Sequence, residues 1–147
     1  MKIDSINLEI IRLLKDGRKP FKEIADILSI TENTVRARVN QMVQEGVLDI
    51  QGLADPKKLP GHQLIYVGIK LDTMDLVHKG EEFSRLKGVV SVSVVTGRYD
   101  LLLTVLLNEG YTLLEFYTSE VAKIGEVNSA ETFIVYKSFN TKVPYIL

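Results

Sequence analysis

The chain has 147 residues, of which 46% are hydrophobic and 25% are charged, a composition that is typical of soluble globular proteins and excludes disordered and fibrous classes. No apolar stretch approaches the roughly 20 residues that a membrane helix needs, and the start MKIDSINLEI lacks the pattern of a signal peptide, so we expect a cytoplasmic protein without membrane contact. Cysteine is absent and the only histidines are His62 and His78, which excludes disulfides and cysteine-type zinc sites. We therefore expect neither a metal nor a cofactor.

The formal net charge is only -1, so the chain lacks the basic excess that marks many nucleic-acid-binding proteins. Residues 1 to 50 contain eight Lys and Arg against eight Asp and Glu. Charge therefore neither indicates nor excludes DNA binding, and any affinity for DNA must come from local placement of cations.

The spacing of apolar residues changes near residue 50. Before Gly46 these residues recur at helical spacing, and after Leu64 they alternate or form short continuous runs. Between the two halves lies QGLADPKKLPGH, which is rich in proline and glycine and reads as an ordered connector. We therefore expect a helical domain over 1–50, a connector over 51–62 and a second domain over 63–147.

The helical domain is predicted to contain three helices. The first begins after Asp4 or Ser5 and ends near Gly17, and the second has Pro20 in its first turn, where the missing N–H costs nothing. Thr31 caps a third helix that runs to about Glu45. The apolar faces consist of Ile6, Ile10, Leu13 and Leu14 in the first helix, of Ile24, Ile27 and Leu28 in the second, and of Val35, Val39 and Met42 in the third.

The third helix has an amide-rich outer face, made of Asn33, Arg36, Ala37, Asn40, Gln41 and Gln44. One interpretation is an ordinary solvated face. The other follows from the short second helix and tight turn before it, which form a helix-turn-helix whose amides and guanidinium can read base edges in a major groove. Glu32 is expected to interact with the helix dipole, and Arg38 suits either a phosphate or a carboxylate of the same domain.

The stretch VLDIQGLA after Gly46 alternates weakly and predicts a strand beside the three helices, which would make the domain winged. In the second half, strands are predicted over 64–71, 89–96, 101–107 and 131–139, with helical patterns between the first and second and between the third and fourth. The order βαββαβ is that of a ferredoxin-like unit, so the predicted fold class is α+β.

Both helices of such a unit cover one face of the sheet, and the opposite face is not polar here. Leu102 and Leu106 point away from Leu101, Leu103, Val105 and Leu107 in an alternating strand. An open apolar face of this size predicts a homodimer that packs sheet on sheet.

Taken together, the two halves resemble the Lrp/AsnC, or feast/famine, family of transcription regulators over essentially the whole chain. The resemblance lies in LLKDGRKPFKEIADILSITENTVRARVNQMVQEGVLD, in ADPKKLPG, and in VTGRYDLLLTV with ETFIVYK. It implies a dimer or octamer that binds double-stranded DNA through the helix-turn-helix. It also implies that a regulatory domain of the RAM type responds to an amino acid or related metabolite.

The resemblance also assigns candidate site residues. It places the DNA-reading helix on Thr31 to Gln44, with Gly110 and Tyr111 near the effector region. The DNA-binding candidates are Thr31, Asn33, Thr34, Arg36, Ala37, Arg38 and Asn40. The effector-binding candidates are Gly97, Arg98, Tyr99 and Asp100 in the hairpin, Tyr111, and Thr132, Phe133, Ile134 and Val135 in the last strand.

Asp100 has two interpretations. Its carboxylate can bind the ammonium group of an amino acid, or a basic side chain, while N–H groups around Gly97, or Arg98, bind the carboxylate of the amino acid. Alternatively, Asp100 caps the hairpin by accepting hydrogen bonds from turn amides, and Gly97 supplies a positive φ.

Two alternatives to a regulator follow from the same residues. Some relatives on this scaffold are siroheme decarboxylases, which we expect to carry clusters of histidine, tyrosine and arginine in the regulatory sheet around the hairpin. GRYDLLLTV contains no histidine, so no acid–base pair is visible and we expect no enzyme. The neutral first half leaves open a ligand-sensing or oligomerisation module with weak or no DNA binding.

Overall fold

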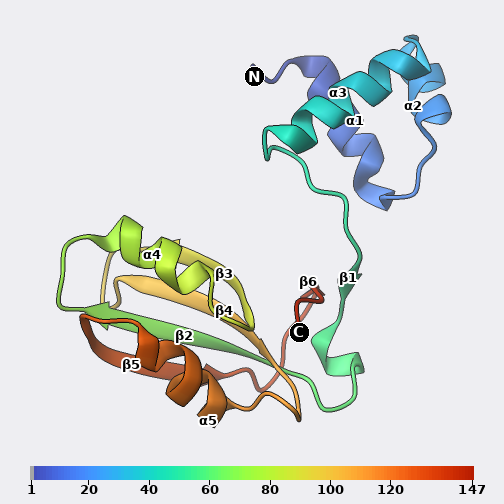
Figure 1. The fold of residues 1–147 in the computed structure, drawn as a ribbon. Coiled ribbons are helices and arrows are strands. Elements are labelled where there is room, and N and C mark those ends of the chain that lie inside the picture. Colours follow the sequence, from blue (N-terminus) through green and yellow to red (C-terminus); the bar gives the residue numbers. More distant parts are fainter. Residues whose placement is uncertain (1) are drawn as a thin grey trace. The chain divides into compact units, whose positions relative to one another are not determined.

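The structure, a computed structural model, describes residues 2–147 and divides into two compact units, Met1–Gln51 and Gly52–Leu147 (Figure 1). Each unit has its own hydrophobic core. Among the described residues, no helix is long and apolar enough to cross a membrane.

The N-terminal unit consists of three helices and a short 3-10 turn, which are α1 (Ser5–Leu13), η1 (Leu14–Asp16), α2 (Phe21–Leu28) and α3 (Glu32–Gln44). The side chain of Asp4 caps α1 by accepting the N–H of Asn7 at 2.8 Å. Gly17, with a φ of 65°, ends the helical segment after η1, and Pro20 is the N-cap of α2. The helical periodicity therefore predicted these helices correctly.

The turn between α2 and α3 positions the third helix. Ser29 adopts a left-handed conformation after α2, and the hydroxyl of Thr31 accepts the N–H of Thr34 at 3.2 Å to cap α3. The helices bury one shared core, made of Ile10, Leu14, Ile24, Ala25, Val35, Val39 and Met42. This is the predicted helix-turn-helix.

The predicted wing was wrong. Residues 47–52 form no strand, because Val47 and Leu48 donate their N–H groups to the carbonyl of Met42 at 2.8 and 3.2 Å and thereby close the end of α3. The first strand, β1 (Leu53–Ala54), already belongs to the second unit and pairs there with β6 (Val143–Pro144). A weakly alternating segment becomes a strand only where a partner backbone is available, and the described part of the helical unit offers none.

The second unit contains an antiparallel sheet of four strands in the order β3-β4-β2-β5. The strands are β2 (Gln63–Leu71), β3 (Val89–Val94), β4 (Leu101–Leu107) and β5 (Val127–Ile134). Helix α4 (Leu76–Ser84) connects β2 to β3, and a helical segment connects β4 to β5, so the unit has the predicted βαββαβ order. This segment consists of α5 (Leu113–Glu115), a π-helical turn (η3, Phe116–Glu120) and a 3-10 turn (η4, Val121–Lys123). A further 3-10 turn, η2 (Pro56–Lys58), precedes the sheet.

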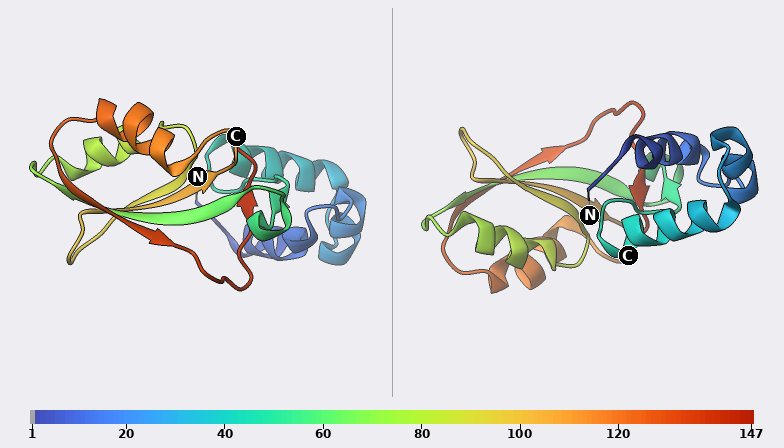
Figure 2. Two further views of the ribbon diagram at one scale, coloured as in Figure 1. Left: turned by 90° about the horizontal axis from the view of Figure 1, so that it is seen from below. Right: turned by 90° about the horizontal axis from the view of Figure 1, so that it is seen from above.

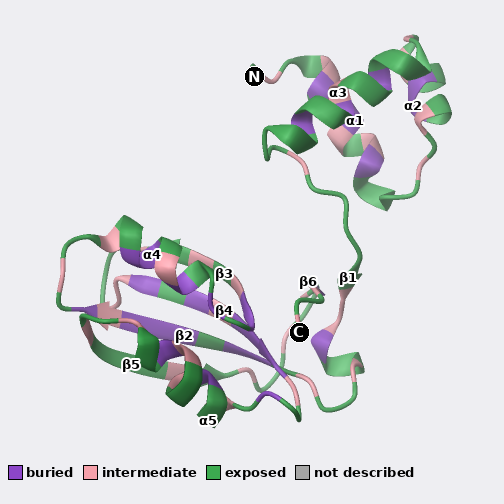
Figure 3. Ribbon diagram, in the orientation of Figure 1, coloured by how far each residue is buried: buried purple, intermediate pink, exposed green. Residues whose placement is uncertain are grey.

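Both helices lie on the same side of the sheet, as the two views of Figure 2 show. The side chains on this side form the core, and β2 and β4 are the most deeply buried strands (Figure 3). The core consists of Ile65, Val67, Ile69 and Leu71 of β2, Leu101, Leu103, Val105 and Leu107 of β4, and residues of the neighbouring elements that include Phe83 and Phe116.

The opposite side of the sheet, called here the open face, is covered by the C-terminal segment only at one end. Leu64 and Leu106 are buried there in a small cluster with Val143 of the C-terminal segment. Farther along, Tyr66 and Leu102 remain 39% and 40% exposed. The expected apolar face is therefore present.

The last strand lies earlier in the chain than expected. It was predicted over 131–139, whereas β5 covers Val127–Ile134 and pairs with β2 from Leu71↔Val127 to Ile65↔Ile134. The reason is that β5 is an edge strand whose residues are mostly exposed, so its first half, VNSA, carries little apolar pattern. Val135 and the residues up to 139 follow the strand.

Candidate nucleic-acid and effector sites

The outer face of α3 is exposed along its whole length. Val35, Val39 and Met42 are buried against the other helices, which turns the opposite side of α3 to solvent. That side carries Asn33, Arg36, Ala37, Asn40, Gln41 and Gln44, all exposed. Asn33 and Asn40 form no side-chain hydrogen bond with any residue of the described chain, so both amides are available to an outside partner.

The two threonines at the start of α3 bond to each other. The hydroxyl oxygens of Thr31 and Thr34 lie 2.8 Å apart, and Thr31 also caps the helix. Both side chains are exposed. They are therefore partly engaged in fixing the helix start, and their remaining hydrogen-bonding capacity faces solvent.

Arg38, for which a phosphate and a carboxylate were equal alternatives, binds a carboxylate. Its Nη1 donates to both oxygens of Asp4 at 2.9 and 2.8 Å and to Oδ1 of Asn7 at 2.7 Å. The hydrogen bond from the N–H of Asn7, together with Arg38, lowers the pKa of Asp4. Arg38 thus links α3 to the start of α1.

The hairpin between β3 and β4 is fixed to β2 by Asp100. Its Oδ1 accepts from Nζ of Lys70 at 2.9 Å and its Oδ2 accepts from the N–H of Leu71 at 2.8 Å. The hydrogen bond from Leu71, followed by that from Lys70, lowers the pKa of Asp100. Gly97 has a φ of 121°, which supplies the expected positive φ of the turn.

The side chain of Tyr99 extends from the hairpin and lies over Gly68 of β2. A Cβ atom at position 68 would be only 2.7 Å from the ring of Tyr99, so this approach requires glycine. The Tyr99 hydroxyl donates to a carboxylate oxygen of Glu131, and its ring meets Phe133 edge-on with 5.9 Å between centroids. The guanidinium of Arg98 lies 5.6 Å from the centroid of the Tyr99 ring and 3.6 Å from Glu131.

Arg98, Tyr99, Glu131 and Phe133 therefore form one cluster on the open face, called here the hairpin cluster. Phe133 and Glu131 pair with Tyr66 and Gly68 of β2. Glu131 was not predicted as a site residue, although it stands two residues before Phe133 and so shares its face of the strand. Gly68 was missed because nothing in the local sequence indicates what lies over it.

Other effector candidates lie elsewhere. Thr132 points to the helix-covered side, where its hydroxyl lies 2.6 Å from that of Tyr117. Tyr111 is buried and donates its hydroxyl to the carbonyl of Lys87 at 2.8 Å, and burial raises its pKa to about 12. Ile134 pairs with Ile65 at the end of β5 and is 53% exposed.

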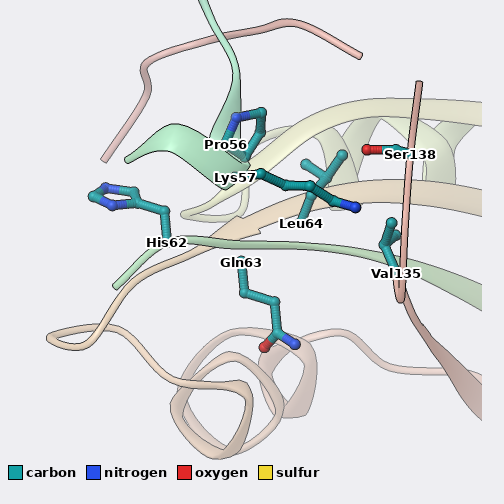
Figure 4. A pocket seen from close by; sticks show the side chains of 7 residues that line it. All are labelled: Pro56, Lys57, His62, Gln63, Leu64, Val135 and Ser138. Carbon is teal, nitrogen blue, oxygen red and sulfur yellow. The ribbon is translucent and has the colours of Figure 1, made fainter. Parts of the chain in front are cut away.

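Val135 lines a small pocket (Figure 4). The ammonium of Lys57 extends toward Val135 in this view and donates to the carbonyl of Tyr136 at 3.4 Å, while Gln63 points the other way. The lining residues are Pro56, Lys57, His62, Gln63, Leu64, Val135 and Ser138. No hairpin residue lines this pocket, so Val135 is separated from the hairpin cluster.

Within the described residues, no group of three or more histidine, aspartate or glutamate side chains is arranged to hold a metal ion. His62 is occupied at both ring nitrogens, with Nδ1 lying 2.7 Å from the carbonyl of Pro60 and Nε2 lying 3.2 Å from the hydroxyl of Tyr145.

Comparison with known proteins gives consistent matches to both units. Residues 3–43 match the model of the AsnC-type helix-turn-helix domain, and residues 64–144 match that of the Lrp/AsnC ligand-binding domain. An uncharacterized HTH-type transcriptional regulator of Pyrococcus abyssi is 32% identical over 92% of this chain and 87% of its own length. The relatives found in this way are named transcriptional regulators.

Two solved structures share the fold of both units. E. coli AsnC is 24% identical, with a TM-score of 0.71 over 94% of this chain and 95% of its own. The transcriptional regulator NMB0573 of Neisseria meningitidis, solved as a complex with L-Met, is 16% identical, with a TM-score of 0.71 over 99% of this chain and 96% of its own.

Proposed function

Because this chain belongs to the Lrp/AsnC family of transcriptional regulators, we propose that it binds specific double-stranded DNA sites through α3 and senses an amino acid or related metabolite through its second unit. The observation that carries the DNA-binding part is the exposed outer face of α3. Asn33, Ala37 and Asn40 lie one helical turn apart on that face, and the two amides have no partner among the described residues.

Such a face has the chemistry of major-groove readout. An asparagine can bond bidentately to adenine, and a methyl group such as that of Ala37 can contact thymine. Arg36 adds a guanidinium in the N-terminal half of α3. Thr31 and Thr34 suit phosphate contacts, since their hydroxyls are exposed at the helix N-terminus.

The DNA-binding proposal is tested by the retardation of the protein's own upstream promoter region at low salt. We expect Asn40→Ala to weaken binding at particular base pairs by about 1 to 3 kcal/mol, the cost of one bidentate contact. Asn128→Ala is the matched control, because it makes the same change on β5 and removes only a hydrogen bond to Asp72. Equal affinity of wild type and Asn40→Ala for every base variant would remove Asn40 from the interface.

The sensing proposal rests on the hairpin cluster. An amino acid brings an ammonium and a carboxylate, and each needs a partner when it leaves water. Glu131 is half exposed and can bind the ammonium between the rings of Tyr99 and Phe133, while Arg98, 79% exposed at its side chain, can bind the carboxylate. Asp100 is assigned the role of holding the hairpin, because both its oxygens already have partners. The L-Met complex of the Neisseria relative supports the choice of amino acids as the ligand class.

A thermal-shift screen of the amino acids tests the sensing part. We expect at least one of them to raise the melting temperature, and we expect Glu131→Gln to remove this shift. Glu81→Gln, on α4, is the control. A shift that is indifferent to Glu131 would place the effector elsewhere, with the pocket at Lys57 and Val135 as the next position to test.

We also propose that the chain forms a homodimer, alone or as the unit of an octamer, through the open face. Tyr66, Leu102 and Phe133 leave about 40% of their surface exposed beside one another on this face, at 39%, 40% and 41%. Aromatic side chains after β5 are exposed as well, notably Tyr136 and Phe139. Apolar surface of this kind is stabilised by association.

A further inference from the structure

Both arginines of the reading helix are held by carboxylates of the same unit, but in different ways. Arg38 bonds to Asp4 and Asn7, which precede it by more than 30 positions, and its side chain is 28% exposed. Arg36 bonds to Glu32, one turn earlier on α3, at 2.6 Å, and the two side chains are 54% and 44% exposed. Arg38 therefore packs α1 against α3, whereas the Arg36–Glu32 pair lies on the surface.

A surface pair at this spacing is weak. Exposed ion pairs one helical turn apart change an equilibrium by only about twofold, because water screens them and two long side chains must be ordered. The guanidinium of Arg36 also lies 5.3 Å from the ring centroid of Phe21, the first residue of α2, so it is held against the start of that helix. A guanine edge, which accepts two hydrogen bonds from one guanidinium, can replace Glu32 as the partner.

Glu32 also places a negative charge where phosphates approach. It is the first residue of α3, next to the exposed hydroxyls of Thr31 and Thr34. The first 50 residues contain eight Lys and Arg and eight Asp and Glu. They therefore have no excess positive charge to offset this repulsion. A carboxylate here therefore opposes every phosphate contact, whatever the DNA sequence.

We propose that Glu32 is a specificity-determining residue of the reading helix. Its carboxylate binds Arg36 in the free protein and repels phosphates. Arg36 therefore contributes to binding only at DNA sites where a base edge replaces Glu32 as its hydrogen-bond partner. Glu32 thus weakens non-specific binding more than specific binding. The inference rests on the proposed DNA binding through α3.

The test compares Glu32→Gln with Glu9→Gln. The second change removes the carboxylate of another exposed intrahelical pair, with Arg12 on α1 at 3.1 Å, so the two variants carry the same charge. Fluorescence anisotropy measures the affinity of each for the upstream promoter region and for a scrambled duplex of equal length, over a range of salt concentrations. Arg36→Ala and the double variant Glu32→Gln/Arg36→Ala are measured as well, so that the four proteins form a double-mutant cycle.

We expect Glu32→Gln to raise affinity for the scrambled duplex about tenfold at low salt and for the promoter by about twofold, so that discrimination falls about fivefold. The slope of log K against log salt should steepen by about 0.9, as for one added phosphate contact. Glu9→Gln should leave both affinities unchanged. With Arg36 already replaced by alanine, the gain of Glu32→Gln on the scrambled duplex should be smaller, because only the repulsion between Glu32 and the phosphates is then relieved.

Equal gains on both duplexes, an equal effect of Glu9→Gln, or an undiminished gain without Arg36 would each overturn the role assigned to Glu32. Wild-type protein that binds neither duplex would contradict the proposed function itself, which separates the two failures. Circular dichroism checks that the variants fold, and Glu32→Ala serves as a second variant because alanine is well tolerated within a helix.

Discussion

At the scale of single residues, the hairpin cluster depends on one glycine. Gly68 lies in the middle of β2, where a side chain would normally stand on the open face, and Tyr99 fills the space instead. This lets Tyr99 reach Glu131 and Phe133 on the neighbouring strand. Tyr99, Glu131 and Phe133, three of the four side chains that we assign to effector binding, are thus brought together because Gly68 has no side chain.

We predict that Gly68→Ala lowers the free energy of unfolding by about 1 to 3 kcal/mol, the usual cost of overpacking. The new methyl group would have to displace the Tyr99 ring, which lies 2.7 Å from the Cβ position. Denaturant unfolding of Gly68→Ala, Tyr99→Ala and the double variant measures the effect. In the Tyr99→Ala background the substitution should cost little, and an undiminished cost would show that Tyr99 does not occupy this space.

Asp100 gives a prediction for pH. Its pKa is lowered from the usual 3.8 by the N–H of Leu71 and by Lys70, so its contribution to stability is present above pH 3.8 and is lost as pH falls through the lowered folded-state value. Asp100→Asn should therefore melt at a lower temperature than wild type at pH 7. The two melting temperatures should converge as pH falls through this lowered value, and a difference that stays constant with pH would contradict the assignment.

Asp100 also illustrates what sequence alone left undecided. The motif GRYD identified the hairpin and offered two roles for the carboxylate. The choice between them depends on Lys70 and Leu71, about 30 positions earlier, whose distance from Asp100 is set by strand pairing. Local sequence does not predict that pairing, and for the same reason it does not predict the contact between Gly68 and Tyr99.

At the scale of elements, the helices were predictable because their signals are local. Apolar residues at helical spacing, Thr31 as a cap and Gly46 as a stop define α3 within one residue of the structure. The strands were predictable where they are buried. The edge strand β5 began four residues earlier than predicted, because its first half is exposed and polar.

We predict that Thr31→Ala destabilises the N-terminal unit by about 1 kcal/mol, within the range of 0.5 to 2 kcal/mol seen for lost helix caps. The change removes the hydroxyl that accepts the N–H of Thr34. Thermal unfolding followed by circular dichroism measures it, with Thr118→Ala as the control because its hydroxyl only bonds to Leu114 within a helical turn. Restoration by Thr31→Ser would assign the effect to the cap.

At the scale of the whole molecule, the open face of the sheet explains why we propose a dimer. The sheet has two edge strands and a partly bare face, which the chain itself covers at the end near Leu64 and Leu106 and, through Tyr99, at Gly68. Sequence predicted this face from the alternation in β4. The missing wing shows the opposite case, because the weak pattern of residues 47–54 yields only the two-residue strand β1, which pairs with β6 within the second unit.

We predict that Leu102→Glu shifts the protein from dimer to monomer. A charge at this position would have to be buried without a partner in a sheet-on-sheet interface. Analytical ultracentrifugation over a dilution series measures the association, and Met74→Glu, at an 88% exposed loop position, is the control. A monomeric wild type at micromolar concentration would contradict the proposed interface.

The claim that one chain both reads DNA and senses a metabolite is tested most directly by measuring the coupling between the two. Fluorescence anisotropy gives the Kd for a labelled promoter with and without the amino acid identified in the screen. We predict that saturating effector changes this Kd by at least about fivefold, and that DNA changes the effector's affinity by the same factor, as linkage requires. A promoter Kd that is identical with and without bound effector would contradict the claim.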